Sequence, residues 1–284
     1  MSFKNKLLQK AINCLKNHPE NRIDELIIFD DLLIGYSSSH DPLFEVLKDP
    51  SVVSPHYLSP RAWLSNAETI ISFFFSFSEK IRKSNRSGRL PSSKWVNAHL
   101  EGEKFIDTFT RLMIKEFETM GENVIAPSQH PNFKIENLKS NWSERHTAYI
   151  CGLGTFGLSE SIITNLGSAG RLSSIITSLK ESPTPRTYTG IYDHCLWHSQ
   201  KKCGACMKKC PPQAILEDGT KNKSICYNHL SKAHGSFHPR YTCGKCQAGM
   251  VCENRKPVKK RQDVREHFLS ERLNDIGDSA LLCS

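Results

Sequence analysis

The sequence lacks the marks of an exported or membrane-spanning protein. Its 284 residues contain no secretory signal, no twin arginine and no long hydrophobic run. Residues 1–10 are charged and amphipathic, and the most apolar stretch, residues 70–77, is far shorter than the roughly 20 residues that cross a bilayer. Internal repeats are also missing, apart from two runs of cysteines. We therefore expect a cytoplasmic protein with no membrane partner, in a compartment that keeps thiols reduced.

Cysteine is abundant, and it is unevenly placed. Eight of the eleven cysteines lie between residues 195 and 252. Cys195 precedes the run Cys203-Gly-Ala-Cys206-Met-Lys-Lys-Cys210-Pro211, and four more follow it: Cys226, Cys243, Cys246 and Cys252. In ferredoxins a C-x-x-C turn supplies thiolates to one 4Fe–4S cluster, and the cysteine before proline binds the other. This crossing rule predicts one cluster on Cys195, Cys203, Cys206 and Cys252, and a second on Cys210, Cys226, Cys243 and Cys246. The predicted chemistry is electron transfer.

The cysteine pattern departs from a regular ferredoxin at two places. Gln200 stands where a regular run has a further cysteine, so Cys195 must supply that ligand across a longer loop. Five residues separate Cys246 from Cys252, and no proline follows Cys252. A histidine could replace Cys195 as the ligand, and the candidates are His194, His198, His229, His234 and His238. Two Cys₄ zinc sites are the alternative to iron–sulfur clusters, whereas a disulfide framework is not expected in a reducing compartment.

The positive charge has more than one interpretation. The formal net charge of +9 would suit a nucleic-acid partner. Eight cluster-bound thiolates and two cubes with core charges of about +2 would lower it to about +5. Many basic residues lie beside the cysteines, at Lys201, Lys202, Lys208, Lys209, Lys256, Lys259, Lys260 and Arg261. They can screen anionic clusters, dock an acidic electron donor, or simply form a solvated basic face.

Hydrophobic periodicity predicts an α+β protein. Helices are expected over residues 3–17, 42–47, 95–120 and 143–151, with Ser143 capping the last helix and Gly152 ending it. Strands are expected over residues 26–36, 68–78 and 123–126, and the segments 161–165 and 172–177 are predicted to form a hairpin. Three parts follow: an α/β domain at residues 1–182, a ferredoxin-like double-cluster module at 183–255, and a basic helical tail at 256–284.

The order of these parts resembles the corrinoid-dependent iron–sulfur reductases, specifically the epoxyqueuosine reductase family, with reductive dehalogenases as distant relatives. The resemblance rests on residues 57–63, residues 144–154, the turns at 154–157 and 167–168, and the cysteine module. It implies a nitroreductase-like first domain that holds cobalamin and receives single electrons from the clusters. It also implies that four residues lie near this corrinoid: Gly152, Gly154, Gly157 and Ser168. Glycines allow close backbone approach, although tight turns alone would also explain them.

Two features of that family are not found here. The family has an Asp proton donor six residues before its Glu, and Leu138 occupies that position ahead of Glu144. A C-terminal helical repeat domain implicated in tRNA binding is also missing, which makes this a short form. We therefore expect only weak, salt-sensitive tRNA binding, an unassigned small-molecule or modified-base substrate, and a low-potential electron donor of the ferredoxin or flavodoxin type.

Substrate reduction usually needs a proton with each electron, so an acid is expected near the cofactor. The candidates are Glu144, His146 and Tyr149, on one predicted helix. Glu144 could instead only favour the helix N-terminus, and His146 could be a surface histidine. Cys151 is predicted to be a small buried hydrophobe, and Cys14 and Cys283 show no metal-ligand spacing. The alternative to an enzyme is a non-enzymatic electron-transfer protein or a reductive activator of a partner protein.

Overall fold

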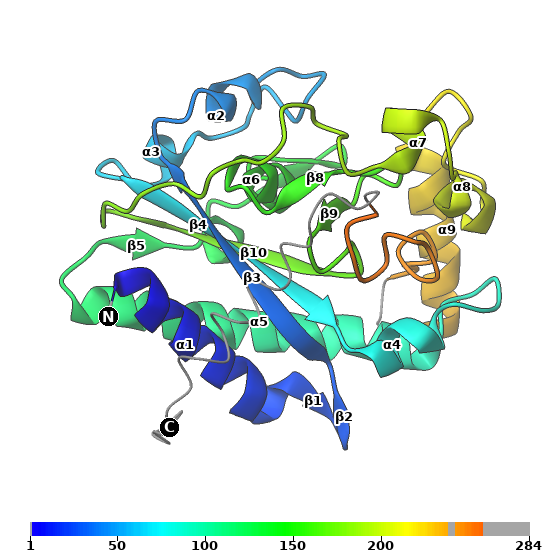
Figure 1. Ribbon diagram of the computed structural model, residues 1–284, viewed down its shortest axis with the longest axis horizontal. Coiled ribbons are helices and arrows are strands. Elements are labelled where there is room, and N and C mark those ends of the chain that lie inside the picture. The colour runs from blue at the N-terminus through cyan, green and yellow to red at the C-terminus, as the bar shows by residue number, and fades with distance from the viewer. Residues whose placement is uncertain (1, 238–241, 258–284) are drawn as a thin grey trace.

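A four-stranded antiparallel sheet forms the centre of the molecule, with helices on both of its faces (Figure 1). The computed structural model describes residues 2–237 and 242–257, with the backbone alone for residues 231–237. The strand order is β3 (Phe29–Ser38), β4 (Thr69–Phe77), β10 (Gly170–Thr177) and β5 (Val124–Ile125). Every residue of β4 is buried, which confirms the strand expected over 68–78 and makes it the centre of the core.

Two helices cover one face of this sheet: α1 (Phe3–Asn17) and α5 (Ser93–Thr119). Both match the helices that the periodicity predicts. Ser92 caps α5, since its hydroxyl accepts a hydrogen bond from the backbone of the first turn. Alternate residues of β4 point into this layer, where Phe75 meets Phe109 of α5 edge-on with ring centroids 4.9 Å apart.

Helix α6 (Glu144–Ile150) packs on the opposite face, against β4 and β10. The helix expected over 143–151 is therefore confirmed. Ser143 occupies the N-cap position as predicted, but its Oγ pairs with His146 Nδ1 at 2.8 Å and makes no capping bond to the backbone. Short elements complete this layer: α2 (Leu43–Val46), α3 (Pro60–Trp63), β6 (Ile135–Glu136), β7 (Lys139–Ser140), β8 (Gly154–Phe156) and β9 (Ile162–Thr164).

The predicted hairpin of segments 161–165 and 172–177 is wrong. β9 pairs with β8 in a separate two-stranded sheet, whereas β10 pairs with β4 and β5. The intervening turn does not close a hairpin because Ser168 and Ala169 donate their backbone N–H groups to the chain at Cys252 and Glu253. The turn residues are therefore used to bind the cysteine-rich segment.

The cysteine-rich segment gathers at one end of the sheet, the end on the right in Figure 1. It carries α7 (Leu196–Gln200), α8 (Ala205–Lys209) and α9 (Lys223–Phe237), and α4 (Glu79–Ser84) lies on the same side of the molecule. The remaining short elements are η1 (Pro19–Asn21), β1 (Arg22–Ile23), β2 (Leu26–Ile27) and η2 (Pro127–Gln129). The predicted tail lies outside the described residues from position 258 onward, as do His238 and Cys283. No helix in the described part of the chain has both the length and the apolarity needed to cross a membrane.

Candidate functional site

Four cysteines from three separate segments line one cavity. They are the four that the crossing rule assigns to a single cluster: Cys195, Cys203, Cys206 and Cys252. Leu158 and Ile163 also line it, so the cavity borders the β8–β9 hairpin. Left-handed backbone at Cys203 (φ 104°) and Gly204 (φ 78°) leads into α8, which carries Cys206. Segments far apart in the chain thus converge on one sulfur-lined space.

The turn between β9 and β10 holds Cys252. Ser168 donates to Cys252 O twice, from its backbone N at 2.8 Å and from Oγ at 3.0 Å. Its Oγ also lies 3.8 Å from Cys252 Sγ. A Cβ on Gly167 would lie 2.4 Å from Asn254 N, so glycine is required for this close approach. The first cysteine group is thereby attached directly to the sheet.

The other four cysteines form a second group: Cys210, Cys226, Cys243 and Cys246. Burial raises the pKa of Cys243 and Cys246, and ionised Cys226 and Cys210 raise both further. Cys210 Sγ accepts a hydrogen bond from Ala214 N at 3.2 Å. The four cysteines that influence one another's pKa here are the four that the spacing assigns to the second cluster.

Contacts with the segment between α4 and α5 anchor this second group. Asn85 Nδ2 donates to Cys243 O at 2.9 Å. Lys245 is buried, and its Nζ donates to Asn85 O at 3.1 Å and to Ser87 O at 2.5 Å. Gly244 lies so close to the Trp95 ring that a Cβ would come within 2.2 Å of it. The spacing of the cysteines did not predict these contacts. The one available signal was Lys245, which lies inside the C-x-x-C loop between Cys243 and Cys246.

The donor set suits iron–sulfur cores. Burial raises the pKa of Cys206 to about 12 and those of Cys246 and Cys252 to about 11, so these thiols keep their protons until a cation displaces them. Eight thiols in two groups of four match two 4Fe–4S clusters in ligand type and number. Among residues 2–237 and 242–257, no three His, Cys, Asp or Glu groups are placed to hold a single metal ion, and no cysteine forms a disulfide.

Glu144 carries a buried carboxyl group with only weak hydrogen bonding, from Ser174, Ser128 and Trp142. Neither carboxylate oxygen is exposed to solvent, and neither has a partner with good hydrogen-bond geometry. Burial raises the pKa of Glu144 to about 7, although the nearby Ser174, Ser128 and Trp142 lower it somewhat. The carboxyl can therefore hold a proton close to neutral pH, which a simple helix N-terminal residue would not do.

His146 and Tyr149 do not converge on Glu144. Both pack against Phe156, with ring centroids 4.8 Å and 6.1 Å away. Residues two apart on a helix do not face each other, so Glu144 points to another side of α6. Burial lowers the pKa of His146 to about 4, which makes it a neutral, largely buried ring and not a surface histidine. The structure thus separates Glu144 from the other two candidates. Cys151 is buried, as predicted.

The four residues predicted near a corrinoid each have close contacts within the chain. A Cβ on Gly154 would lie 2.2 Å from Ile163 O, and one on Gly152 would lie 3.0 Å from Thr184 Cγ2. Gly157 lines the cavity of the first cysteine group, and the Ser168 hydroxyl is bonded to Cys252 O. Close packing against the chain itself therefore explains these residues.

The histidines near the cysteines have other contacts. His194 Nδ1 lies 2.7 Å from Ile163 O, and His198 stacks on Tyr192 with ring centroids 3.8 Å apart. Cys195 itself lines the cavity. The side chains of His234 and His238 lie outside the described part.

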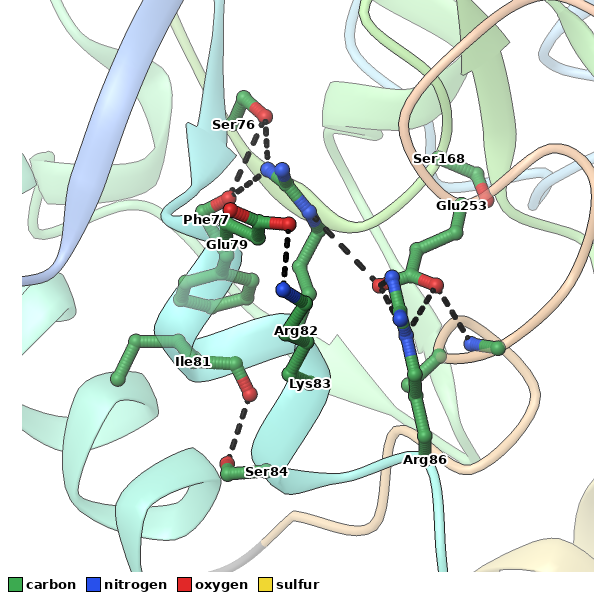
Figure 2. Close-up of polar contacts among 12 residues, drawn as sticks. Ser76, Phe77, Glu79, Ile81, Arg82, Lys83, Ser84, Arg86, Ser168 and Glu253 are labelled. Atoms are coloured by element: carbon green, nitrogen blue, oxygen red, sulfur yellow. Dashed lines mark hydrogen bonds and ion pairs between the residues drawn. The ribbon is translucent and has the colours of Figure 1, made fainter.

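Sequence reasoning missed Glu253, which directly follows Cys252 and is buried. Figure 2 shows its carboxylate between Arg82 and Arg86. The one available signal was an acidic residue where a regular ferredoxin run has proline after the cysteine.

Several solved structures of reductive enzymes are similar to this fold. An epoxyqueuosine reductase from Streptococcus thermophilus matches 92% of this chain and 69% of its own with a TM-score of 0.55 and 15% identity. An epoxyqueuosine reductase solved with a modified tRNA-Tyr stem loop matches 90% of this chain and 66% of its own (TM-score 0.52, 16% identity). A reductive dehalogenase described with a B12-dependent mechanism matches 86% of this chain and 32% of its own (TM-score 0.51, 13% identity).

The sequence comparison gives a narrower answer. The epoxyqueuosine reductase of Staphylococcus aureus is 22% identical over 222 residues, which are 72% of this chain and 52% of that protein. The chain thus spans about half the length of this relative. No protein-family model matches the chain. The chain is therefore distantly similar to the epoxyqueuosine reductases in sequence, and it shares their mixed α/β fold.

Proposed function

We propose that this protein is a cytoplasmic iron–sulfur oxidoreductase, related to the epoxyqueuosine reductases, that carries two 4Fe–4S clusters on the eight cysteines. One observation carries the proposal: the four cysteines that the spacing assigns to one cluster line a single cavity. Clusters bound there would supply one-electron transfer. The cavity borders the β8–β9 hairpin, next to α6, so this chain brings the thiol ligands close to its first domain.

The polypeptide also supplies a proton. The Glu144 carboxyl, with a pKa of about 7, can hold a proton at neutral pH and release it to a reduced substrate. Leu138, at the position of the family's acid, is exposed on the turn between β6 and β7, and it has no proton to give. Glu144 is therefore our candidate for the acid, and the substrate remains an unassigned small molecule or modified base.

The metal content tests this proposal. Anaerobically purified protein should contain about eight iron and eight sulfide per chain. Cys195→Ser and Cys243→Ser each remove a ligand from a different group, so each should lose about four irons and a different cluster signal in electron paramagnetic resonance (EPR) spectra. The two variants control for each other. A colourless protein with stoichiometric zinc would contradict the proposal, and unchanged iron in Cys195→Ser would assign that ligand to another residue.

Cobalamin is the electron acceptor that we propose, and this part rests on the distant similarity alone. The contacts proposed for it are the four residues that the family resemblance implies: Gly152, Gly154, Gly157 and Ser168. Incubation with cobalamin under reducing conditions, followed by desalting and visible spectroscopy, should leave about one corrinoid per chain. Protein that keeps its iron but retains no corrinoid would favour the alternative, an electron-transfer protein or reductive activator of a partner. The exposed Leu138 is the observation that favours this alternative.

We propose that tRNA binds only weakly, through charge. Filter binding across a salt series should show affinity that is lost by physiological ionic strength, as expected when binding depends on counterion release. Selective tRNA binding that survives physiological salt would contradict this and make epoxyqueuosine in tRNA the leading substrate. The proposed electron donor is a low-potential ferredoxin or flavodoxin.

A further inference from the structure

Glu253 has a buried carboxylate that pairs with two arginines and accepts a backbone hydrogen bond. Only 2% of the residue is exposed, and it directly follows the cavity cysteine Cys252. Arg86 binds it with two prongs, since Nε lies 3.0 Å from Oε2 and Nη2 lies 3.2 Å from Oε1 (Figure 2). Gly249 N donates to Oε2 at 2.8 Å. The carboxylate therefore closes the loop from 249 to 253 and holds it against the segment that follows α4.

A second arginine connects this carboxylate to the sheet. Arg82 Nε lies 3.7 Å from Glu253 Oε1, and only 8% of the Arg82 side chain is exposed. Arg82 Nη1 donates to Phe77 O and, at 3.2 Å, to Ser76 Oγ at the end of β4 (Figure 2). The backbone adds a further contact, because Ala169 N donates to Glu253 O at 3.0 Å. Glu253 thus joins β4, α4 and the turn before β10.

These contacts lie where the cysteine spacing is irregular. A regular run fixes its last ligand by a short spacer and a following proline. Here five residues separate Cys246 from Cys252, and glutamate takes the place of proline. A carboxylate next to a thiolate ligand would add unfavourable negative charge unless cations pair with it, and two arginines do so. The ion pairs replace the constraint that the regular spacing would give.

We propose that Glu253 is a positioning residue that places Cys252 in the first cysteine group through its ion pairs with Arg86 and Arg82. This inference rests on the proposed iron–sulfur function and assigns to it a residue outside the ligand set. The second group is bonded to the same segment through different side chains, those of Asn85 and Lys245. Loss of Glu253 should therefore affect one cluster and spare the other.

Iron content and EPR spectra of the anaerobically purified full chain test this role. Glu253→Gln keeps the size of the side chain but removes its charge, so iron should fall from about eight to about four per chain, with the signal of one cluster lost. Arg86→Gln leaves Arg82 in place and should give a partial loss of the same signal. Glu79→Gln is the matched control, because it breaks an exposed ion pair with Lys83 on α4 and should keep all eight irons.

Three outcomes decide the matter. Glu253→Gln protein with eight irons and unchanged spectra would overturn the role of Glu253, and so would an equal loss of both clusters. If Glu253→Gln does not fold by circular dichroism, Arg86→Gln decides: selective loss of one signal supports the role, and full iron content overturns it. Wild-type protein without iron would instead refute the proposed function, so the two failures are distinguishable.

Discussion

Two regions of the molecule bury charged side chains, and they treat them differently. Beside the cysteines, Glu253 is paired with Arg86, and Lys245 donates to two backbone carbonyls. On α6, the Glu144 oxygens are buried with no charged partner, and the hydrogen bonds from Ser174, Ser128 and Trp142 do not offset the effect of burial on its pKa. A buried charge with partners fixes the segments that supply them, whereas a buried carboxyl without a charged partner reduces the cost of burial by keeping its proton. Under the proposed function, the first region would hold the cluster ligands in place, and the second would hold a proton for release to the substrate.

The largest expected effect comes from Glu144→Gln. The pKa of this carboxyl is about 7 in the folded protein and 4.5 when exposed, because burial disfavours the carboxylate. The folded state therefore keeps a proton that the unfolded chain releases, and stability falls as the pH rises from 4.5 to about 7. Glutamine carries no titrating proton and removes this loss. The unfolding free energy of the variant should therefore rise by about 2–3 kcal/mol relative to that of wild type as the pH is raised from 5 to 8. Anaerobic urea denaturation at several pH values measures it.

The matched control is Glu136→Gln, an exposed glutamate on the β6–β7 hairpin, which should follow wild type at every pH. Reductase activity should be measured on the same variant, so that its stability and its activity can be compared. The Glu144→Gln variant should be more stable at pH 8 and yet lose the proton-dependent step. If the difference in unfolding free energy between Glu144→Gln and wild type were the same at pH 5 and pH 8, the pKa of Glu144 would not be raised, and this prediction would be wrong.

The next largest effect is expected for Lys245→Met. Methionine keeps most of the apolar stem but leaves Asn85 O and Ser87 O without their donor. Losing hydrogen bonds from a charged group should cost about 2 kcal/mol, which corresponds to about 4–8 °C in melting temperature for a chain of this size. Lys208→Met is the control, since Lys208 is exposed and its loss should change stability by less than about 0.5 kcal/mol. Equal shifts in both variants would mean that Lys245 is only another surface charge.

Sequence patterns predicted the elements with strong periodicity. The apolar face of α5 was found because its residues recur at helical spacing, and β4 was found because it is a short run rich in Ile and Phe. The hairpin of 161–165 with 172–177 was wrong because nearness in the chain suggested the wrong partner. β10 has a better partner in β4, with which it pairs along its whole length. Partner choice in a sheet depends on tertiary contacts that a local window does not contain.

In the candidate site, too, local features could be predicted from the sequence and tertiary contacts could not. Cysteine spacing named the four residues that line one cavity, since ligand spacing is a local property. The ion pair of Arg86 with Glu253 joins residues 167 positions apart, and no spacing rule predicts it. On α6, the sequence placed all three candidate acids on one helix, and helical periodicity already puts residues 144 and 146 on different sides of it.

The smallest effect is expected for Ser168→Ala. This variant tests how the region beside the cysteines, where buried charges are paired, holds Cys252. The variant loses the Oγ hydrogen bond to Cys252 O, while the backbone N–H of residue 168 still binds the same oxygen. The cost should therefore be about 1 kcal/mol, or a fall of about 2–4 °C in melting temperature. Since the hydroxyl also lies 3.8 Å from Cys252 Sγ, the reduction potential of the first cluster should fall as well.

Redox titration followed by EPR separates the two possible roles of Ser168. If the hydroxyl serves the first cysteine group, only that cluster shifts in potential, the iron content stays near eight, and corrinoid retention is unchanged. Gln247, whose Nε2 lies 3.3 Å from Ser168 O, offers a matched control: Gln247→Leu removes a nearby polar group that does not touch Cys252 in the described contacts. Unshifted potentials together with lost corrinoid retention in Ser168→Ala would return Ser168 to the cofactor role that the family resemblance implied. Such a result would place the corrinoid against the cysteine-binding turn and not beside Glu144.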